Sequence, residues 1–189
     1  MTIIAALLGL VSCGPPADLV SSLPGIDDLG KTKLWSGYIE IQNPSTITKM
    51  IHYVLAESQS DPRKDPLVIW FNGGPGCSSM LGFMQENGPF LWETGNSTWS
   101  GHNNYTWNKE ANVLYIEQPA GVGFSYFKDV KQMNEYMFND DNVAVDNLHS
   151  VLVWYEMFPE FKTNDLYISG ESYAGIYVPY LLNAIHHHN

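Results

Sequence analysis

The stretch Gly170-Glu-Ser-Tyr-Ala-Gly175 decides the expected fold of this 189-residue chain. It follows an apolar run at 165–169, predicted to be a strand, and it opens a second apolar run at 176–185, predicted to be a helix. A serine at the tip of such a sharp strand-to-helix turn projects its hydroxyl above the sheet. Small residues are needed two positions before and two after the serine, and Gly170 and Ala174 satisfy this, although glycine is usual in both places. A match to this motif is weak evidence when taken alone, and the predicted strand before it and helix after it strengthen the interpretation.

Other apolar runs indicate the sheet that carries this turn. Residues 66–71 form a continuous apolar run, and 112–117 and 165–169 have the same character, which is typical of strands covered on both faces in a mostly parallel sheet. Residues 37–41 and 52–56 are predicted to form an early antiparallel pair. No repeat or low-complexity segment is visible, so we expect one domain.

A helix is predicted between the second and third continuous runs. Apolar side chains recur at helical spacing from Val143 to Tyr155, Asp140 or Asp141 is placed to cap the segment, and Pro159 follows it. Strand, helix and strand joined by short loops favour an α/β fold. We interpret the helix as part of the core.

A glycine-rich loop, Asn72-Gly-Gly-Pro-Gly76, follows the run at 66–71. Glycines allow backbone N–H groups to point into a cavity, where they can bind a developing oxyanion. Taken alone, the loop is better explained as a plain turn. Upstream of a nucleophile turn, however, it occupies the place of the oxyanion loop in esterase-type folds, so the two motifs together favour a hydrolase.

The composition excludes several classes of protein. Nine basic and 20 acidic residues give a net charge of −11, which disfavours nucleic acid and anionic membranes as partners. Only 15% of the residues are charged and 44% are hydrophobic, so the chain is not a charge-rich disordered protein. An acidic surface suits a protein in an acidic or extracellular setting.

The first 17 residues are predicted to be a signal peptide, cleaved after Cys13 or Ala17. They carry no charged side chain, and the apolar run at 3–11 is shorter than the roughly 20 residues of a membrane span. No Lys or Arg precedes this run, so a buried N-terminal strand and a bacterial lipoprotein cleavage box at 10–13 remain alternatives. Glycosylation sequons at Asn96 and Asn104 also favour the secretory pathway.

Four motifs together resemble the serine carboxypeptidases, which are lysosomal, vacuolar or secreted α/β hydrolases that remove C-terminal residues from peptides. The likeness extends from Leu34 to Leu182. The motifs are Trp70-Phe-Asn-Gly-Gly-Pro-Gly-Cys-Ser-Ser79, Glu86-Asn-Gly-Pro89, Glu117-Gln-Pro-Ala-Gly-Val-Gly-Phe-Ser-Tyr126 and Gly170-Glu-Ser-Tyr-Ala-Gly175. The resemblance implies that peptide or protein C-termini are the substrates and that no metal or other cofactor is needed.

The resemblance also implies a nucleophile, an oxyanion hole and a site for the substrate's terminal carboxylate. Ser172 would be the nucleophile, and the backbone N–H groups of Gly74 and Tyr173 would form the oxyanion hole. The terminal carboxylate would be bound by Asn72, Gly73, Glu86 and Glu171. Two neighbouring carboxyl groups resist ionising together, so one of them keeps a proton at mildly acidic pH and can donate it to a carboxylate. We therefore expect peptide turnover to fall from acidic to neutral pH.

The chain departs from the family where the triad should be completed. Family members place an Asp and then a His far downstream of the serine, whereas 189 − 172 = 17 residues follow Ser172 here and none is acidic. His186 lies 14 residues along the predicted helix, or about 21 Å of axial rise, which is too far for a hydrogen bond to the serine. Earlier histidines match no catalytic position and are expected to be surface or satisfied side chains; these are His52, His102 and His149.

The preferred interpretation is therefore an α/β-hydrolase fold that ends after the nucleophile turn and its following helix. Residues 18–189 would be the N-terminal half of a serine carboxypeptidase domain, inactive without the missing acid and base. In the family, the cysteine at position 77 forms a disulfide with the missing half. Two alternatives are a carboxypeptidase-like acyltransferase and a non-catalytic binding or interfering partner. Metal binding by His186–His188 is disfavoured, because three consecutive helical residues fan around the axis.

Overall fold

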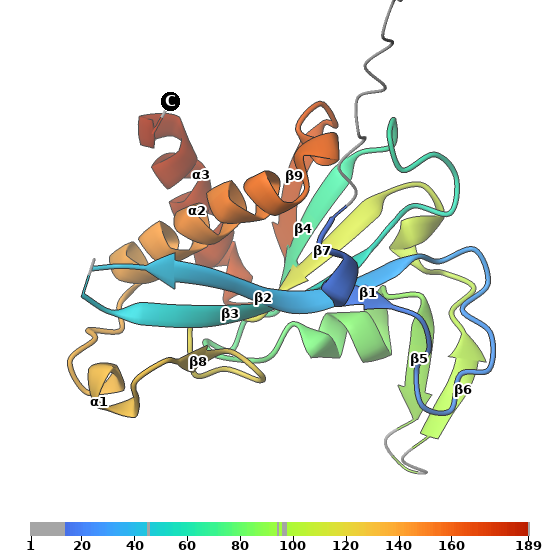
Figure 1. Cartoon of the computed structure of the whole chain (residues 1–189), viewed down its shortest axis with the longest axis horizontal. Helices are drawn as coiled ribbons and strands as arrows, with labels where there is room; N and C mark the ends of the chain where they lie inside the picture. Colours follow the sequence, from blue (N-terminus) through green and yellow to red (C-terminus); the bar gives the residue numbers. More distant parts are fainter. Residues whose placement is uncertain (1–13, 45, 94, 96–97, 189) are drawn as a thin grey trace, which may run out of the picture.

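The computed structural model describes residues 14–44, 46–93, 95 and 98–188. A mixed sheet forms its centre, and a small hairpin stands beside it (Figure 1). The main sheet has the order β1 (Leu19–Val20), β2 (Leu34–Gln42), β3 (Thr48–Ala56), β7 (Asn112–Ile116), β4 (Leu67–Phe71) and β9 (Leu166–Gly170), with β8 (Tyr126–Phe127) paired to β3. The hairpin consists of β5 (Phe90–Glu93) and β6 (Thr98–His102).

The predicted strands are confirmed, but the sheet is less parallel than predicted. Strands β7, β4 and β9 run parallel, and these are the three continuous apolar runs. Strands β2 and β3 form the predicted antiparallel pair over nine residues each, and β3 also pairs antiparallel with β7 and β8. The sheet is mixed because the antiparallel pair β2 and β3 belongs to the same sheet as the three parallel strands.

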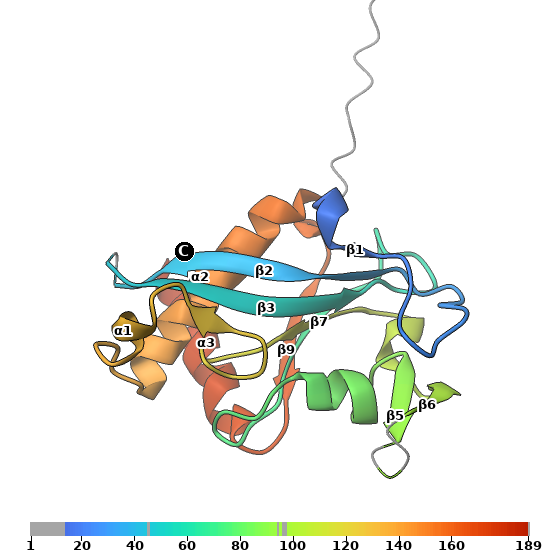
Figure 2. The same cartoon turned by 60° about the horizontal axis from the view of Figure 1, so that its bottom comes forward.

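The two faces of the sheet bury separate hydrophobic clusters. Helices α2 (Asp140–Met157) and α3 (Ala174–His188) cover one face, where Phe71, Trp154 and Tyr177 belong to the larger cluster. The π-helix η2 (Gly82–Glu86) and the β5–β6 hairpin lie on the other side (Figure 2), where Trp70 and Phe83 belong to the second cluster. The C-terminal ends of β4, β7 and β9 therefore emerge between two packed layers. Short helices η1 (Pro16–Asp18), η3 (Trp107–Lys109), α1 (Val130–Met133) and η4 (Pro159–Phe161) complete the fold.

The N-cap of helix α2 lies one residue before the first of the two predicted cap positions. The side chain of Asn139 accepts a hydrogen bond of 2.8 Å from the backbone N–H of Asn142, so Asn139 is the N-cap. The prediction of Asp140 or Asp141 as the cap is wrong. Both carboxylates lie in the first turn instead, where the helix dipole favours negative charge.

A buried ion pair joins α2 to β3. The ammonium nitrogen of Lys49, a residue without exposed surface, lies 2.6 Å from Oδ2 of Asp146. The hydroxyl of Tyr136 donates to the same carboxylate oxygen at 2.7 Å. With its hydrogen bonds satisfied, the pair fixes the helix against the sheet, and losing either partner would leave a buried charge uncompensated.

Candidate active site

Ser172 stands on a bend between β9 and α3. Its φ is +56°, and among the described residues it is the only non-glycine residue with positive φ. This conformation costs an L-residue roughly 1–2 kcal/mol, and its appearance at a single exposed serine is typical of a functional site. The local fold therefore has the strand, sharp turn and helix that the motif predicts.

Crowding at the bend explains the small residues around the serine. A Cβ on Gly170 would overlap the carbonyl oxygen of Phe71 and lie 2.5 Å from Cβ of Ala174. The backbone N–H of Glu171 also donates to that carbonyl oxygen, at 3.2 Å. The bend is thus packed directly onto the end of β4, which leads into the glycine-rich loop.

The glycine-rich loop and the serine bend are in contact. A Cβ on Gly73 would overlap the backbone nitrogen of Tyr173 and would lie 2.7 Å from the carbonyl oxygen of Glu171. The loop closes through a hydrogen bond of 3.0 Å from the N–H of Cys77 to the carbonyl of Gly73. Gly74, with φ of +111°, occupies a conformation that favours glycine. Within the described residues, the N–H groups of Gly74 and Tyr173 donate to no protein acceptor.

Asn72 joins two carboxyl groups beside this contact. It has no exposed surface, and its Nδ2 donates to Oε1 of Glu86 at 3.2 Å and to Oε1 of Glu171 at 3.1 Å. The amide is held in this orientation because its oxygen accepts hydrogen bonds of 2.9 Å from Nε1 of Trp70 and from the N–H of Gly82. Both carboxyl groups remain open to solvent.

The π-helix η2 brings Glu86 to this cluster. Its wider turn is closed by a hydrogen bond of 3.0 Å from the N–H of Asn87 to the carbonyl of Gly82. Partial burial raises the pKa of Glu86, and the negative charge of Glu171 raises it further, while the hydrogen bond from Asn72 acts in the opposite direction. The geometry therefore favours a proton on Glu86 at mildly acidic pH.

Of the remaining predicted site residues, some lie in the described part of the chain and some outside it. Asn104 is exposed in a turn, whereas Asn96 lies outside the described residues, as do residues 1–13 with Cys13. Cys77 is exposed and carries a free thiol. His102 is exposed and His149 is half-buried. Among the described residues, no cluster of His, Cys, Asp and Glu could hold a metal ion, and no helix is long and apolar enough to cross a membrane.

Sequence reasoning gave no separate role to Glu117 or to its neighbour His52. Glu117 follows β7 directly, without exposed surface, and Oε2 of its carboxylate lies 2.9 Å from Nδ1 of His52. The signal in the sequence was an acidic residue at the end of the apolar run at 112–117. His52 is buried and both of its ring nitrogens have hydrogen-bonding partners, which agrees with the prediction that it is a satisfied side chain.

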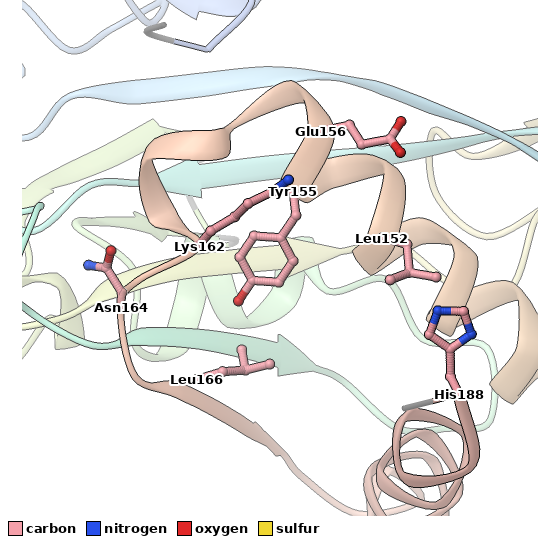
Figure 3. A pocket seen from close by; sticks show the side chains of 7 residues that line it. All are labelled: Leu152, Tyr155, Glu156, Lys162, Asn164, Leu166 and His188. Carbon is pink, nitrogen blue, oxygen red and sulfur yellow. The ribbon is translucent and has the colours of Figure 1, made fainter. Parts of the chain in front are cut away.

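One cavity lies away from the serine bend. It encloses about 600 Å³ and is shown in Figure 3. Its walls come from α2, from the segment before β9, from the first residue of β9 and from the end of α3; the residues are Leu152, Tyr155, Glu156, Lys162, Asn164, Leu166 and His188. None of the predicted site residues lines it, so cavity size alone does not locate this site.

Comparison with known proteins places the geometry in a family. The serine carboxypeptidase family model matches residues 24–189. Serine carboxypeptidase-like 20 of Arabidopsis thaliana is 41% identical, covering 98% of this chain and 37% of that relative. The lysosomal protective protein of Mus musculus is 46% identical, covering 88% of this chain and 33% of that relative.

A solved structure shows the same architecture. The crystal structure of a prohormone-processing carboxypeptidase from Saccharomyces cerevisiae superposes with a TM-score of 0.75 at 29% identity, covering 89% of this chain and 37% of that one. The chain spans about a third of the length of the relatives it matches. Its sequence and its α/β-hydrolase architecture together show that the chain belongs to the serine carboxypeptidase family.

Proposed function

We propose that this chain supplies the nucleophile, the oxyanion hole and the carboxylate-binding groups of a serine carboxypeptidase. The observation that carries the proposal is the contact between Gly73 and the backbone of Tyr173 and Glu171, because it brings the glycine-rich loop against the serine bend. The triad Asp and His would come from sequence outside these 189 residues, since the matched relatives are about three times longer.

The proposed reaction is acyl transfer through Ser172. Its Oγ attacks the carbonyl carbon of the last peptide bond while its proton passes to the general base, and the N–H groups of Gly74 and Tyr173 bind the oxyanion that forms. The C–N bond breaks, the C-terminal residue leaves with a proton from the general acid, and water then hydrolyses the acyl-serine. Without a base, the serine hydroxyl is a poor nucleophile, so the chain alone should hydrolyse a blocked dipeptide no faster than its Ser172→Ala variant.

Recognition of the substrate's C-terminus is assigned to the carboxyl cluster. Protonated Glu86 would donate to the terminal carboxylate, while the two side-chain N–H groups of Asn72 hold both carboxyl groups in position. At higher pH, ionised Glu86 and Glu171 together would repel the same carboxylate, so the peptide should bind best at acidic pH. This arrangement disfavours the acyltransferase alternative, because an acyl ester donor offers no free terminal carboxylate.

The carboxylate site is tested with blocked dipeptides, one with a free C-terminus and one with a C-terminal amide, titrated into the chain at pH 5 and pH 7.5. We expect the free acid to bind more tightly at pH 5 and to lose this advantage at pH 7.5. In the Glu86→Gln variant, which keeps an amide N–H donor at both pH values, the advantage should persist at pH 7.5. Equal binding of acid and amide at pH 5 would contradict the proposal.

A non-catalytic binding role is a second candidate, favoured by one observation. The outer strand β9 and helix α3 expose large apolar side chains, including Leu166, Tyr167 and Leu182. Such a surface at a sheet edge can pair with another chain. Sequencing the transcript beyond Asn189 separates the two candidates, because a continuing reading frame with a later Asp and His supports catalysis and a genuine stop codon supports the binding role.

A further inference from the structure

A second serine in this chain has the contacts of an activated nucleophile. Ser36 lies on β2, and its Oγ is 3.0 Å from Nε2 of His52 on the neighbouring strand β3. The other ring nitrogen, Nδ1, lies 2.9 Å from Oε2 of Glu117. Serine, histidine and carboxylate are thus connected in the order of a catalytic triad, which is recognised by geometry and not by sequence position.

The contacts of Glu117 determine which ring nitrogen of His52 carries the proton. Burial acts to raise the pKa of Glu117, but hydrogen bonds from His52, from the hydroxyl of Ser78 and from the N–H of Phe124 outweigh burial and lower it. An ionised carboxylate only accepts hydrogen bonds, so Nδ1 of His52 must donate to it. In the neutral ring Nε2 is then an acceptor, and the Ser36 hydroxyl donates to it.

The surrounding structure holds this arrangement rigidly. Glu117 has no exposed surface and His52 is 7% exposed. The backbone N–H of His52 donates to Oγ of Ser125 at 2.8 Å, which fixes the strand against the segment that wraps the carboxylate. Gly123, with φ of +54°, lets that segment approach, because a Cβ there would overlap the Glu117 carboxylate.

Ser36 and His52 both line an open cavity of about 380 Å³, which is within the range of small-ligand sites. The other lining residues are mainly apolar or aromatic: Gly37, Tyr38, Val54, Met80 and Phe124. The rings of His52 and Phe124 have centroids 5.2 Å apart, so the phenyl group stands beside the base. None of the proposed carboxypeptidase residues lines this cavity.

We propose that Ser36 is a second nucleophile, oriented and activated by His52 and Glu117, which takes the acyl group of small apolar esters bound in this cavity. Ser36 Oγ bonds to the ester carbonyl carbon while its proton passes to Nε2 of His52. The ester C–O bond then breaks, and His52 returns the proton to the departing alcohol oxygen, which leaves an acyl-serine and a free alcohol. This reaction needs neither Ser172 nor sequence outside the chain, so it is independent of the proposed carboxypeptidase function.

The test is covalent labelling with a small alkyl fluorophosphonate, followed by mass spectrometry of the labelled peptide. Ser36 Oγ forms the bond to phosphorus, fluoride leaves, and His52 takes the hydroxyl proton. We expect the label on Ser36 in the unmutated chain and also on Ser36 in the Ser172→Ala variant, and none at this position in Ser36→Ala. In His52→Gln the rate should fall at least about a hundredfold, because a general base contributes that much or more.

Asp146→Asn is the matched control, since it removes a buried carboxylate of another network without touching the cavity. Its labelling rate should stay within about twofold of the unmutated chain, even if its stability falls. Should His52→Gln fail to fold, the conservative Ser36→Ala variant decides the question alone. Absence of label at Ser36, label confined to Ser172, or equal labelling in a folded His52→Gln variant would overturn the proposal.

Discussion

The contact between the glycine-rich loop and the serine bend predicts that replacing Gly73 by alanine destabilises the chain, whereas replacing Gly175 by alanine does not. In Gly73→Ala the new methyl group meets the backbone nitrogen of Tyr173, the carbonyl oxygen of Glu171 and, at 3.1 Å, the backbone nitrogen of Ala174. These are main-chain atoms of a packed bend, so they cannot move aside as a flexible side chain would. Overpacking of this kind costs about 1–3 kcal/mol.

Gly175 provides the matched control at the same site. It lies in the first turn of α3, and a Cβ there would meet nothing within 4 Å. Gly175→Ala should therefore be neutral or stabilising by up to about 1 kcal/mol, because alanine has the higher helix propensity. Urea unfolding of both variants, followed by circular dichroism, measures the free energies of unfolding. For a chain of this size about 2 kcal/mol corresponds to about 4–8 °C in Tm. A Gly73→Ala variant as stable as the unmutated chain would refute the reasoning.

Three further predictions concern charge and strain. Because hydrogen bonds hold the pKa of Glu117 below its unfolded value of about 4.3, its contribution to stability is present above that pH and is lost as pH falls through the folded pKa. Glu117→Gln should therefore destabilise by about 1–3 kcal/mol at pH 7, as expected for lost hydrogen bonds to a buried charge, and by less at pH 3 in urea unfolding; an equal loss at both pH values would contradict this. Ser172→Gly should be more stable than Ser172→Ala by about 1 kcal/mol, since only glycine relieves the positive φ, and equal midpoints would argue against strain. Asp146→Asn should cost about 3 kcal/mol by leaving the Lys49 ammonium unpaired, and an unchanged Tm would show that the pair contributes little.

Local sequence signals were sufficient for the elements that carry the site. Strands β4 and β7 were predictable because burial on both faces demands continuous apolar runs, as at 67–71. Strand β9 has a similar apolar run, but it lies at the edge of the sheet, where Leu166 and Tyr167 are exposed. The turn at Ser172 was predictable because only small residues fit beside it. The N-cap of α2 was missed by one residue, since Asn139, Asp140 and Asp141 are all good caps and only the backbone conformation selects among them.

Features that depend on contacts distant in sequence could not be predicted in the same way. The π-helix that positions Glu86 has no periodic apolar pattern of its own, and its Gly82 is selected by the indole of Trp70. The pair of His52 and Glu117 is separated by 65 positions, so its geometry exists only after β3 and β7 have joined the sheet. In the sequence, the only sign of this pair was the acidic residue Glu117 at the end of an apolar run, and that pattern occurs in many sites without a histidine partner.

The central claim is that the amides of the glycine-rich loop lie directly beside the hydroxyl-bearing bend. Nuclear Overhauser spectroscopy on the isotope-labelled chain measures this without any substrate. The Hα of Gly73 that occupies the Cβ direction points at the backbone nitrogen of Tyr173, so a strong cross-peak to the Tyr173 amide proton is expected. Assigned signals for both residues with no cross-peak between them would show that the loop and the bend are apart, and the proposed oxyanion hole would not exist.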